Sequence, residues 1–136
     1  MTQPLQLSVV QPCTDRGLFA VARPMLTDWM DTLVDYVRSG HEDLTNRQMA
    51  LLMVVYQRPG PHTVRGLARE LSVSKPVVTR ALNRLGSLGY LARQRDEHDR
   101  RNVFVAQTQA GAKFLDDFGQ LVTGSSGHRE PQRAAA

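Results

Sequence analysis

The sequence predicts a mainly α fold that contains one small β-hairpin, an α+β arrangement. Apolar residues recur every three or four positions in several segments that end at glycine or proline, which is the period of an amphipathic helix. Two short runs, 90–92 and 103–106, have strand composition and enclose a tip with four arginines and three acids. Two helices joined by a short turn and followed by such a hairpin are typical of a winged helix-turn-helix. We expect this unit to be flanked by an N-terminal helical region and a short C-terminal helix.

Length and composition favour one soluble domain. The chain has 136 residues, of which 41% are hydrophobic and 22% are charged, and these are ordinary values for a globular protein. No apolar run approaches the roughly 20 residues that span a bilayer, and the N-terminus does not have the pattern of a signal peptide. The single Cys13 excludes an internal disulfide and fits a reducing compartment. We therefore expect a cytoplasmic protein without a membrane partner, in which Cys13 is an inert thiol, with oxidant sensing as the alternative.

The first part of the chain predicts an arm followed by a helix. Residues 1–13 show no helical period and form the expected flexible arm, and residues 14–43 form an N-terminal helical region. Pro24 predicts a break or restart, because proline lacks the N–H that a helix interior needs. The helix after it ends near Ser39-Gly40. Its apolar residues at helical spacing are Leu26, Trp29, Met30, Leu33, Val34 and Val37.

Two helices come next, at the start of a core unit that we expect to span residues 44–108. Thr45 and Gln48 have capping-box spacing, and the helix that they open ends at Arg58-Pro59-Gly60-Pro61. Thr63 caps a shorter helix, and Ser72-Val73 forms a tight connection after it. The expected apolar faces of the two helices are Met49, Leu52, Met53 and Tyr56 in the first and Val64, Leu67, Ala68 and Leu71 in the second.

The third helix of this unit, 74–88, has one core face and one polar face. Ser74 is its expected cap, and Pro76 lies in the first turn, where a missing N–H costs little. The core face is formed by Val78, Ala81, Leu82 and Leu85, and the opposite face by Pro76, Val77, Arg80, Asn83, Arg84 and Ser87. Arginine and asparagine can bond guanine and adenine edges in a major groove. This face therefore predicts a nucleic-acid contact, with a solvated helix face as the alternative.

One more helix follows the hairpin. Thr108 is expected to cap it, and its apolar stripe is Ala112, Leu115, Phe118 and Val122, so the C-terminal helix is predicted over 109–122. The single winged-helix domain then covers residues 14–122. Residues 123–136 have no apolar stripe and predict a disordered tail.

Positive charge is concentrated in the predicted core unit. Residues 44–108 contain eleven Lys or Arg against four acids, a balance of +7, whereas residues 1–43 contain three against six, a balance of −3. A concentrated positive field favours a polyanionic partner. Double-stranded DNA is the partner that this pattern predicts.

Several segments between residues 26 and 115 share a pattern with one regulator family. They are Leu44-Thr45-Asn46-Arg47-Gln48, Leu67-Ala68-Arg69-Glu70-Leu71-Ser72-Val73-Ser74, Val78-Thr79-Arg80, Leu85-Gly86-Ser87-Leu88-Gly89-Tyr90-Leu91-Ala92-Arg93 and Asp99-Arg100-Arg101. In order and spacing they resemble MarR-type winged helix-turn-helix transcription regulators. The most specific part is the Asp-x-Arg at the hairpin tip, followed by Thr108-Gln109-Ala110-Gly111.

The resemblance implies a homodimer that reads a pseudo-palindromic site, with half-sites roughly 34 to 36 Å apart. It places helix 74–88 in the major groove and the wing, 93–103, in the minor groove. Asp99 would orient Arg101 in the groove, while Arg95 and Arg100 contact phosphates; the alternative is that Asp99 and Arg101 only stiffen the hairpin by pairing. The expected DNA-contacting residues are Ser74, Lys75, Pro76, Val77, Thr79, Arg80, Asn83, Arg84, Arg95, Asp99, Arg100 and Arg101.

Two positions depart from the family pattern. Gln107 stands where leucine is usual, which weakens one core contact or indicates a different neighbour. Helical sequence also fades near Thr123, although relatives close with long dimer-forming helices. The expected dimer interface therefore rests on the N-terminal helix, where the same side chains are shared with packing inside the monomer: Trp29, Met30, Leu33 and Val37. The resemblance leaves a small-molecule effector open.

The sequence offers no catalytic or metal-binding pattern. His41, His62, His98 and His128 are scattered, and one cysteine cannot build a zinc site. We expect no metal, no cofactor and no enzyme activity. The predicted function is a sequence-specific DNA-binding transcription regulator, with repression as the expected output. The alternative is a winged-helix interaction or architectural module without strong sequence preference.

Overall fold

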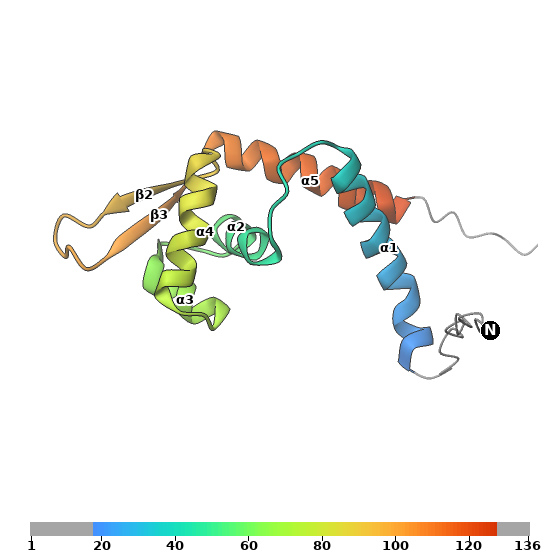
Figure 1. Ribbon diagram of the computed structural model, residues 1–136, viewed down its shortest axis with the longest axis horizontal. Helices are drawn as coiled ribbons and strands as arrows, with labels where there is room; N and C mark the ends of the chain where they lie inside the picture. The colour runs from blue at the N-terminus through green and yellow to red at the C-terminus, as the bar shows by residue number, and fades with distance from the viewer. Residues whose placement is uncertain (1–17, 128–136) are drawn as a thin grey trace, which may run out of the picture.

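The computed structural model describes residues 18–127, which form five helices and three short strands (Figure 1). Helix α1 spans Leu18–Arg38 and helix α5 spans Gln109–Gly127. Between them lie α2 (Asn46–Gln57), β1 (His62–Thr63), α3 (Val64–Leu71), α4 (Lys75–Ser87), β2 (Leu91–Arg95) and β3 (Val103–Gln107). The predicted mainly α fold with a small hairpin is confirmed.

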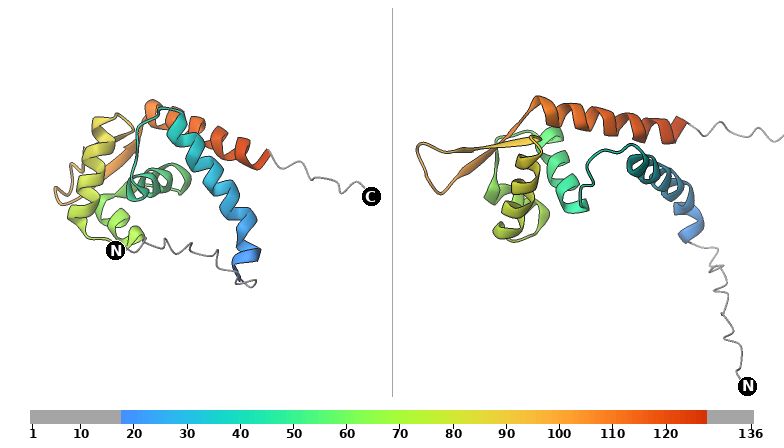
Figure 2. Two further views of the ribbon diagram at one scale, coloured as in Figure 1. Left: turned by 45° about the vertical axis from the view of Figure 1, so that its right-hand side comes forward. Right: turned by 45° about the horizontal axis from the view of Figure 1, so that its top comes forward.

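The elements divide between two ends of an elongated molecule. Helices α1 and α5 pack against each other at one end, and α2, α3, α4 and the strands gather at the other (Figure 1, Figure 2). Helix α5 links the two ends, because it starts directly after β3 and extends to α1 (Figure 2). No helix within residues 18–127 has the length and apolar character needed to cross a bilayer.

The sheet contains one strand more than the sequence predicted. Its order is β1-β3-β2 and both pairings are antiparallel. The hairpin register pairs Leu91 with Gln107 and Arg95 with Val103, so the strands are longer than the predicted runs. Strand β1 pairs His62 with Val105. A strand of two residues has no periodicity to reveal it, which explains why sequence alone missed it.

The core lies where α2, α4, α3 and the sheet meet. Its largest fully buried side chains include Leu51, Leu52, Leu67, Leu82 and Leu85. The predicted core face of α4 is confirmed, since Val78, Ala81, Leu82 and Leu85 are all buried. Helix α2 differs from the prediction.

The buried residues of α2 are Leu51, Leu52 and Val55, whereas the predicted Met49, Met53 and Tyr56 are only partly buried. The reason is that α4, β3 and α5 all contact α2. The helix is therefore covered over a wider arc than one amphipathic stripe.

Helix α1 continues through Pro24 without the predicted break. Pro24 is exposed, so its ring does not have to fit into the packed core, and the helix tolerates the proline in spite of its missing N–H. The predicted end of this helix is correct: α1 stops at Arg38, and Gly40 has a φ of 73°, which suits glycine.

Helix α5 begins as predicted but has a different register and end. The Gly111 N–H donates to Thr108 Oγ1 at 3.1 Å, which is the expected cap. The buried positions are Gly111, Phe114 and Phe118, while Ala112 and Leu115 are partly buried and Val122 is exposed. The Phe114 ring causes this register, because it packs 4.7 Å from the Tyr90 ring and 6.2 Å from the Tyr36 ring, measured between centroids.

The expected helix end at Val122 is wrong, because α5 runs to Gly127. Residues 123–127 are thus helical rather than part of a disordered tail. The expected arm over 1–13, Cys13, and the rest of the expected tail, 128–136, lie outside the described residues.

Candidate nucleic-acid interface

Helix α4 is held in a helix-turn-helix by short-range main-chain contacts. Thr63 Oγ1 accepts from the Gly66 N–H at 3.0 Å, so it caps α3 as predicted. Ser72 ends α3 in the left-handed region with a φ of 52°, and the Val73 N–H donates to the Ala68 carbonyl at 3.0 Å. Ser74 has the extended backbone of a cap, but its side chain makes no cap hydrogen bond. The predicted Ser74 cap is therefore correct in position and not in its bond.

The polar face of α4 is open to solvent over its first three turns. Lys75, Pro76, Arg80 and Asn83 are exposed, and Val77 and Thr79 are partly buried. The buried face opposite them fixes the direction in which these side chains extend. The Thr79 hydroxyl donates to the Lys75 carbonyl at 3.1 Å, so it is engaged by its own helix. Arginine, lysine and asparagine on one exposed face supply the donors that base edges and phosphates accept.

Arg84 is the exception among the predicted contacts. Its Nη2 atom lies 3.1 Å from Oε2 of Glu42, which precedes α2 in the chain. The periodicity of α4 places Arg84 on the outer face, yet the guanidinium is paired with an acid from a distant segment. No local pattern predicts a pair whose members are 42 positions apart.

The wing tip is shaped by its acids. Asp99 Oδ1 accepts from the Arg101 N–H at 3.0 Å, and Asp96 Oδ1 accepts from the His98 N–H at 2.9 Å. These are turn contacts of the kind that aspartate makes with the backbone two residues on. The Asp96 N–H then donates to the Asn102 carbonyl at 3.1 Å, which closes the tip.

The guanidinium groups of the wing arginines take no part in these turn contacts. Among the described ion pairs none joins Asp99 to the Arg101 guanidinium; the carboxylate holds the Arg101 main chain instead. The alternative, in which the Asp99 and Arg101 side chains pair to stiffen the hairpin, is therefore not observed among the described ion pairs. Arg95, Arg100 and Arg101 are all exposed.

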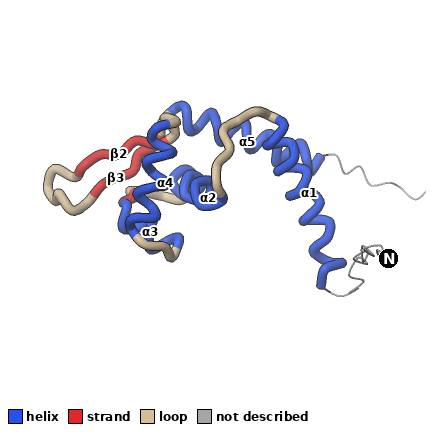
Figure 3. Tube along the Cα trace, viewed as in Figure 1, coloured by secondary structure: helices blue, strands red, loops and turns tan. Residues whose placement is uncertain are grey.

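The wing and α4 belong to the same end of the molecule. The β2 and β3 strands extend from beside α4 and away from α1 (Figure 1, Figure 3). Helix α4 also contacts β2 directly. Helix α4 and the arginine-rich wing therefore lie side by side. This is the arrangement in which a winged helix contacts a major groove and the minor groove next to it.

One further arginine near α4 was missed by sequence reasoning. Arg47 lies in the first turn of α2 and lines a hollow together with residues of α2 and α4, namely Thr45, Gln48, Val77, Arg80 and Ala81. Helix N-termini favour anions, and this hollow is lined by both Arg47 and Arg80. The signal in the sequence is its position two residues after the capping Thr45.

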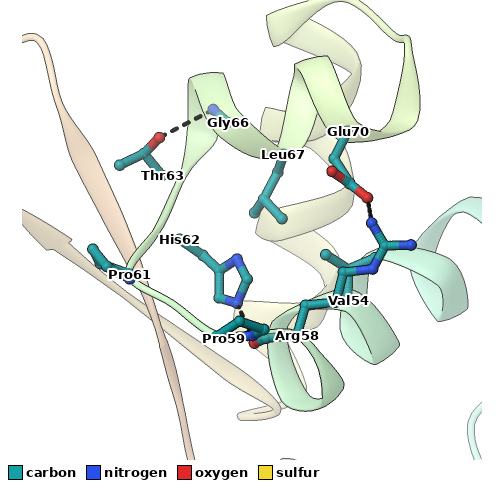
Figure 4. A pocket seen from close by; sticks show the side chains of 9 residues that line it. All are labelled: Val54, Arg58, Pro59, Pro61, His62, Thr63, Gly66, Leu67 and Glu70. Atoms are coloured by element: carbon teal, nitrogen blue, oxygen red, sulfur yellow. Dashed lines mark hydrogen bonds and ion pairs between the residues drawn. The ribbon is translucent and has the colours of Figure 1, made fainter.

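Arg58, in contrast, has a structural role. Figure 4 shows the pocket in which Arg58 forms an ion pair with Glu70, and in which the His62 Nε2 lies 3.0 Å from the Arg58 carbonyl oxygen. These contacts tie the end of α2 to β1 and α3. Other residues that line the pocket are Val54, Pro59, Pro61, Thr63, Gly66 and Leu67.

Gln107 and Tyr56 join the hairpin to α2. The Gln107 side-chain amide donates to the Val55 carbonyl at 3.0 Å. Glutamine at this position, where the family usually has leucine, therefore has a polar neighbour. The Tyr56 hydroxyl accepts from the Thr108 N–H at 2.8 Å and lies 3.0 Å from the Tyr90 carbonyl. Within the part of the chain that the structure describes, no cluster of three or more His, Cys, Asp or Glu side chains could hold a metal.

Comparisons with known proteins agree with this geometry. Residues 42–102 match the model of the MarR family. The chain is 30% identical to the HTH-type transcriptional regulator YwhA of Bacillus subtilis, over 54% of this chain and 55% of that protein, so it spans about half the length of that relative.

Solved structures share the fold. The YusO protein of Bacillus subtilis has a TM-score of 0.66 at 18% identity and covers 81% of this chain and 75% of its own. A complex of MepR from S. aureus with DNA has a TM-score of 0.60 at 21% identity, covering 79% of this chain and 82% of its own. The predicted winged-helix fold and the MarR-type resemblance are confirmed.

Proposed function

We propose that this chain, whose residues 42–102 match the model of the MarR family, is a sequence-specific DNA-binding transcription regulator that acts as a repressor in the cytoplasm. The observation that carries the proposal is that α4 and the wing lie at the same end of the molecule (Figure 3), where the polar face of α4 and the wing arginines are exposed. The net charge of +7 over residues 44–108 supports it, since that segment builds this end. MepR, which has the same fold, was solved in complex with DNA.

The contacts are assigned by the chemistry of each side chain. Arg80 and Asn83 read base edges in the major groove, where guanine and adenine match their donors and acceptors. Ser74, Lys75 and the first N–H groups of α4 contact phosphate. Pro76, Val77 and Thr79 complete the surface that enters the groove.

The wing contributes positioning and minor-groove contacts. Arg101 enters the minor groove, where a narrow groove concentrates negative potential, and Asp99 holds the Arg101 main chain in place. Arg95 and Arg100 contact the phosphate backbone and add affinity without sequence preference. Arg47 adds one more phosphate contact from α2.

A second copy of the chain completes the regulator. Helix α1 exposes seven large apolar side chains, and four of them are the residues predicted for the interface. The seven are Met25, Leu26, Trp29, Met30, Leu33, Val34 and Val37. Trp29 is 47% exposed and Met30 is 53% exposed. A contiguous apolar face of this kind marks a protein interface, and a twofold dimer would present two α4 helices to a pseudo-palindromic site.

The proposal is tested by separating base reading from phosphate contact. Arg80→Ala or Asn83→Ala should change the ranking of DNA sequences, by about 1–3 kcal/mol per lost base contact. Arg95→Ala should weaken all sequences alike and lower the slope of log affinity against log salt by about 0.9. Binding measured by titration against a panel of duplexes distinguishes these effects. An unchanged ranking for both α4 variants would contradict sequence reading by this helix.

A further inference from the structure

The segment between α1 and α2, residues 39–45, is tied to three helices. We call it the linker. The Tyr36 hydroxyl of α1 donates to the Glu42 carbonyl, and the Leu44 N–H donates to the same hydroxyl at 3.4 Å. His41 Nε2 lies 3.8 Å from Asp117 Oδ2 of α5. Glu42 Oε2 lies 3.1 Å from Arg84 Nη2 of α4. The linker therefore holds Glu42 in place by its main chain while its carboxylate contacts α4.

The main-chain anchor is a firm one. Burial raises the pKa of the Tyr36 hydroxyl, so this group keeps its proton and remains a donor to the Glu42 carbonyl. The Tyr36 ring also packs edge-on against Phe118 with centroids 5.5 Å apart. A carboxylate whose backbone is already fixed loses less conformational freedom when it pairs with an arginine.

Arg84 is placed where a free guanidinium would meet DNA. It follows Arg80 by one helical turn, roughly 6 Å further along the same outer face, and that face is the one assigned to the groove. The side chains of Arg84 and Glu42 are 47% and 48% exposed, so the pair is accessible to a competing anion. A carboxylate and a DNA phosphate offer the guanidinium the same kind of acceptor oxygens.

We propose that Glu42 is a positioning residue that withholds Arg84 from the DNA backbone by taking the place of a phosphate. The inference rests on the proposed function, since it concerns how many cations the protein brings to a duplex. In the protein–DNA complex Arg84 remains paired with Glu42, and the duplex is contacted by Arg80, Asn83 and the wing. It also makes Glu42 a determinant of affinity, although it touches no DNA.

The test counts phosphate contacts through the salt dependence of binding. The full-length chain is titrated with a fluorescently labelled duplex of one fixed mixed sequence at a series of salt concentrations. Glu42→Gln keeps the size of the side chain and removes its charge. We expect the slope of log affinity against log salt to steepen by about 0.9, the value for one added phosphate contact. At low salt the affinity should rise roughly twofold to fivefold, the scale of one exposed charge pair.

Two controls separate this effect from general electrostatics. Asp43→Asn removes the same charge from the neighbouring residue, which forms no ion pair among the described residues, and it should leave the slope unchanged. Adding Glu42→Gln to Arg84→Gln should also leave the slope of the Arg84→Gln variant unchanged. Thermal unfolding followed by circular dichroism establishes that each variant is folded.

The outcomes are distinct. Wild-type chain that binds no duplex at low salt contradicts the proposed function and this inference together. Wild-type binding with equal effects of Glu42→Gln and Asp43→Asn overturns the inference alone, as does a Glu42→Gln effect that persists without Arg84. A steeper slope for Glu42→Gln that needs Arg84 supports it.

Discussion

At the scale of single residues, Tyr56 explains why position 111 is glycine. The Tyr56 hydroxyl lies 2.8 Å from both the N–H and the carbonyl oxygen of Thr108 and 3.0 Å from the Tyr90 carbonyl. The first turn of α5 passes directly over this cluster. A Cβ built on Gly111 would collide with the Tyr56 hydroxyl and the Tyr90 carbonyl oxygen. The close approach of α5 to α2 therefore requires the absence of a side chain.

Gly111→Ala should destabilise the protein by about 3 kcal/mol, the upper part of the range for overpacking, because one of the colliding atoms is a main-chain oxygen that cannot rotate away. The measurement is the midpoint of urea unfolding at one fixed protein concentration, with the slope of the transition unchanged.

Gly119→Ala in the same helix is the matched control, since its added Cβ meets nothing within 4 Å. There the gain in helix propensity should stabilise the protein by roughly 0.5–1 kcal/mol. Equal effects at the two positions would refute the steric explanation for Gly111.

Residue-level prediction succeeded where the determinant was local. The Thr45 and Gln48 capping box is formed as expected, with both bonds present. Thr63 and Thr108 also cap their helices. The partner of Arg84 could not be predicted, because Glu42 lies 42 positions away and meets Arg84 only in the packed fold. The same holds for Gln107, whose acceptor on Val55 is brought to it only by the packed fold.

At the scale of elements, helix faces were predictable and their exact registers were less so. Helix α4 contacts the core on one side only, and its predicted stripe is the observed one. Helix α2 is covered from several sides, so a single stripe could not describe it. In α5 the predicted stripe through Ala112 and Leu115 does not include Phe114, whose ring contacts with Tyr36 and Tyr90 set the observed register. Tertiary packing thus overrides a helical period when a helix has more than one neighbour.

The exposed apolar face of α1 is expected to form the contact between two copies of the chain. Met30→Glu should convert a dimer into a single chain, because a charge buried in an apolar interface without a partner costs about several kcal/mol. Sedimentation or mass photometry at matched concentrations gives the stoichiometry, and circular dichroism reports whether α1 is still helical.

Arg38→Glu, on the same helix, is the control. Arg38 is exposed and pairs only loosely with Asp35 at 3.9 Å, so this larger change of charge should leave the assembly intact. A Met30→Glu variant that remains a dimer would show that the face of α1 is not the contact between copies.

At the scale of the whole molecule, the charge distribution and the shape agree. The basic segment 44–108 forms the end that holds α4 and the wing, and the acidic N-terminal segment contributes α1 at the other end (Figure 2). The fold class and the proposed contact face follow from periodicity, caps and charge. The reach of α5 to Gly127 does not, because glycine and serine are poor helix formers.

Two copies of this chain are proposed to present α4 and the wing to one duplex. This arrangement is tested by selection of bound fragments from random DNA, with the mass of the complex measured in parallel. We expect a pseudo-palindromic motif whose half-sites are one helical turn apart, roughly 34 to 36 Å, in a complex of two chains per duplex. Fragments without a shared motif, or a motif bound by a single chain, would contradict it.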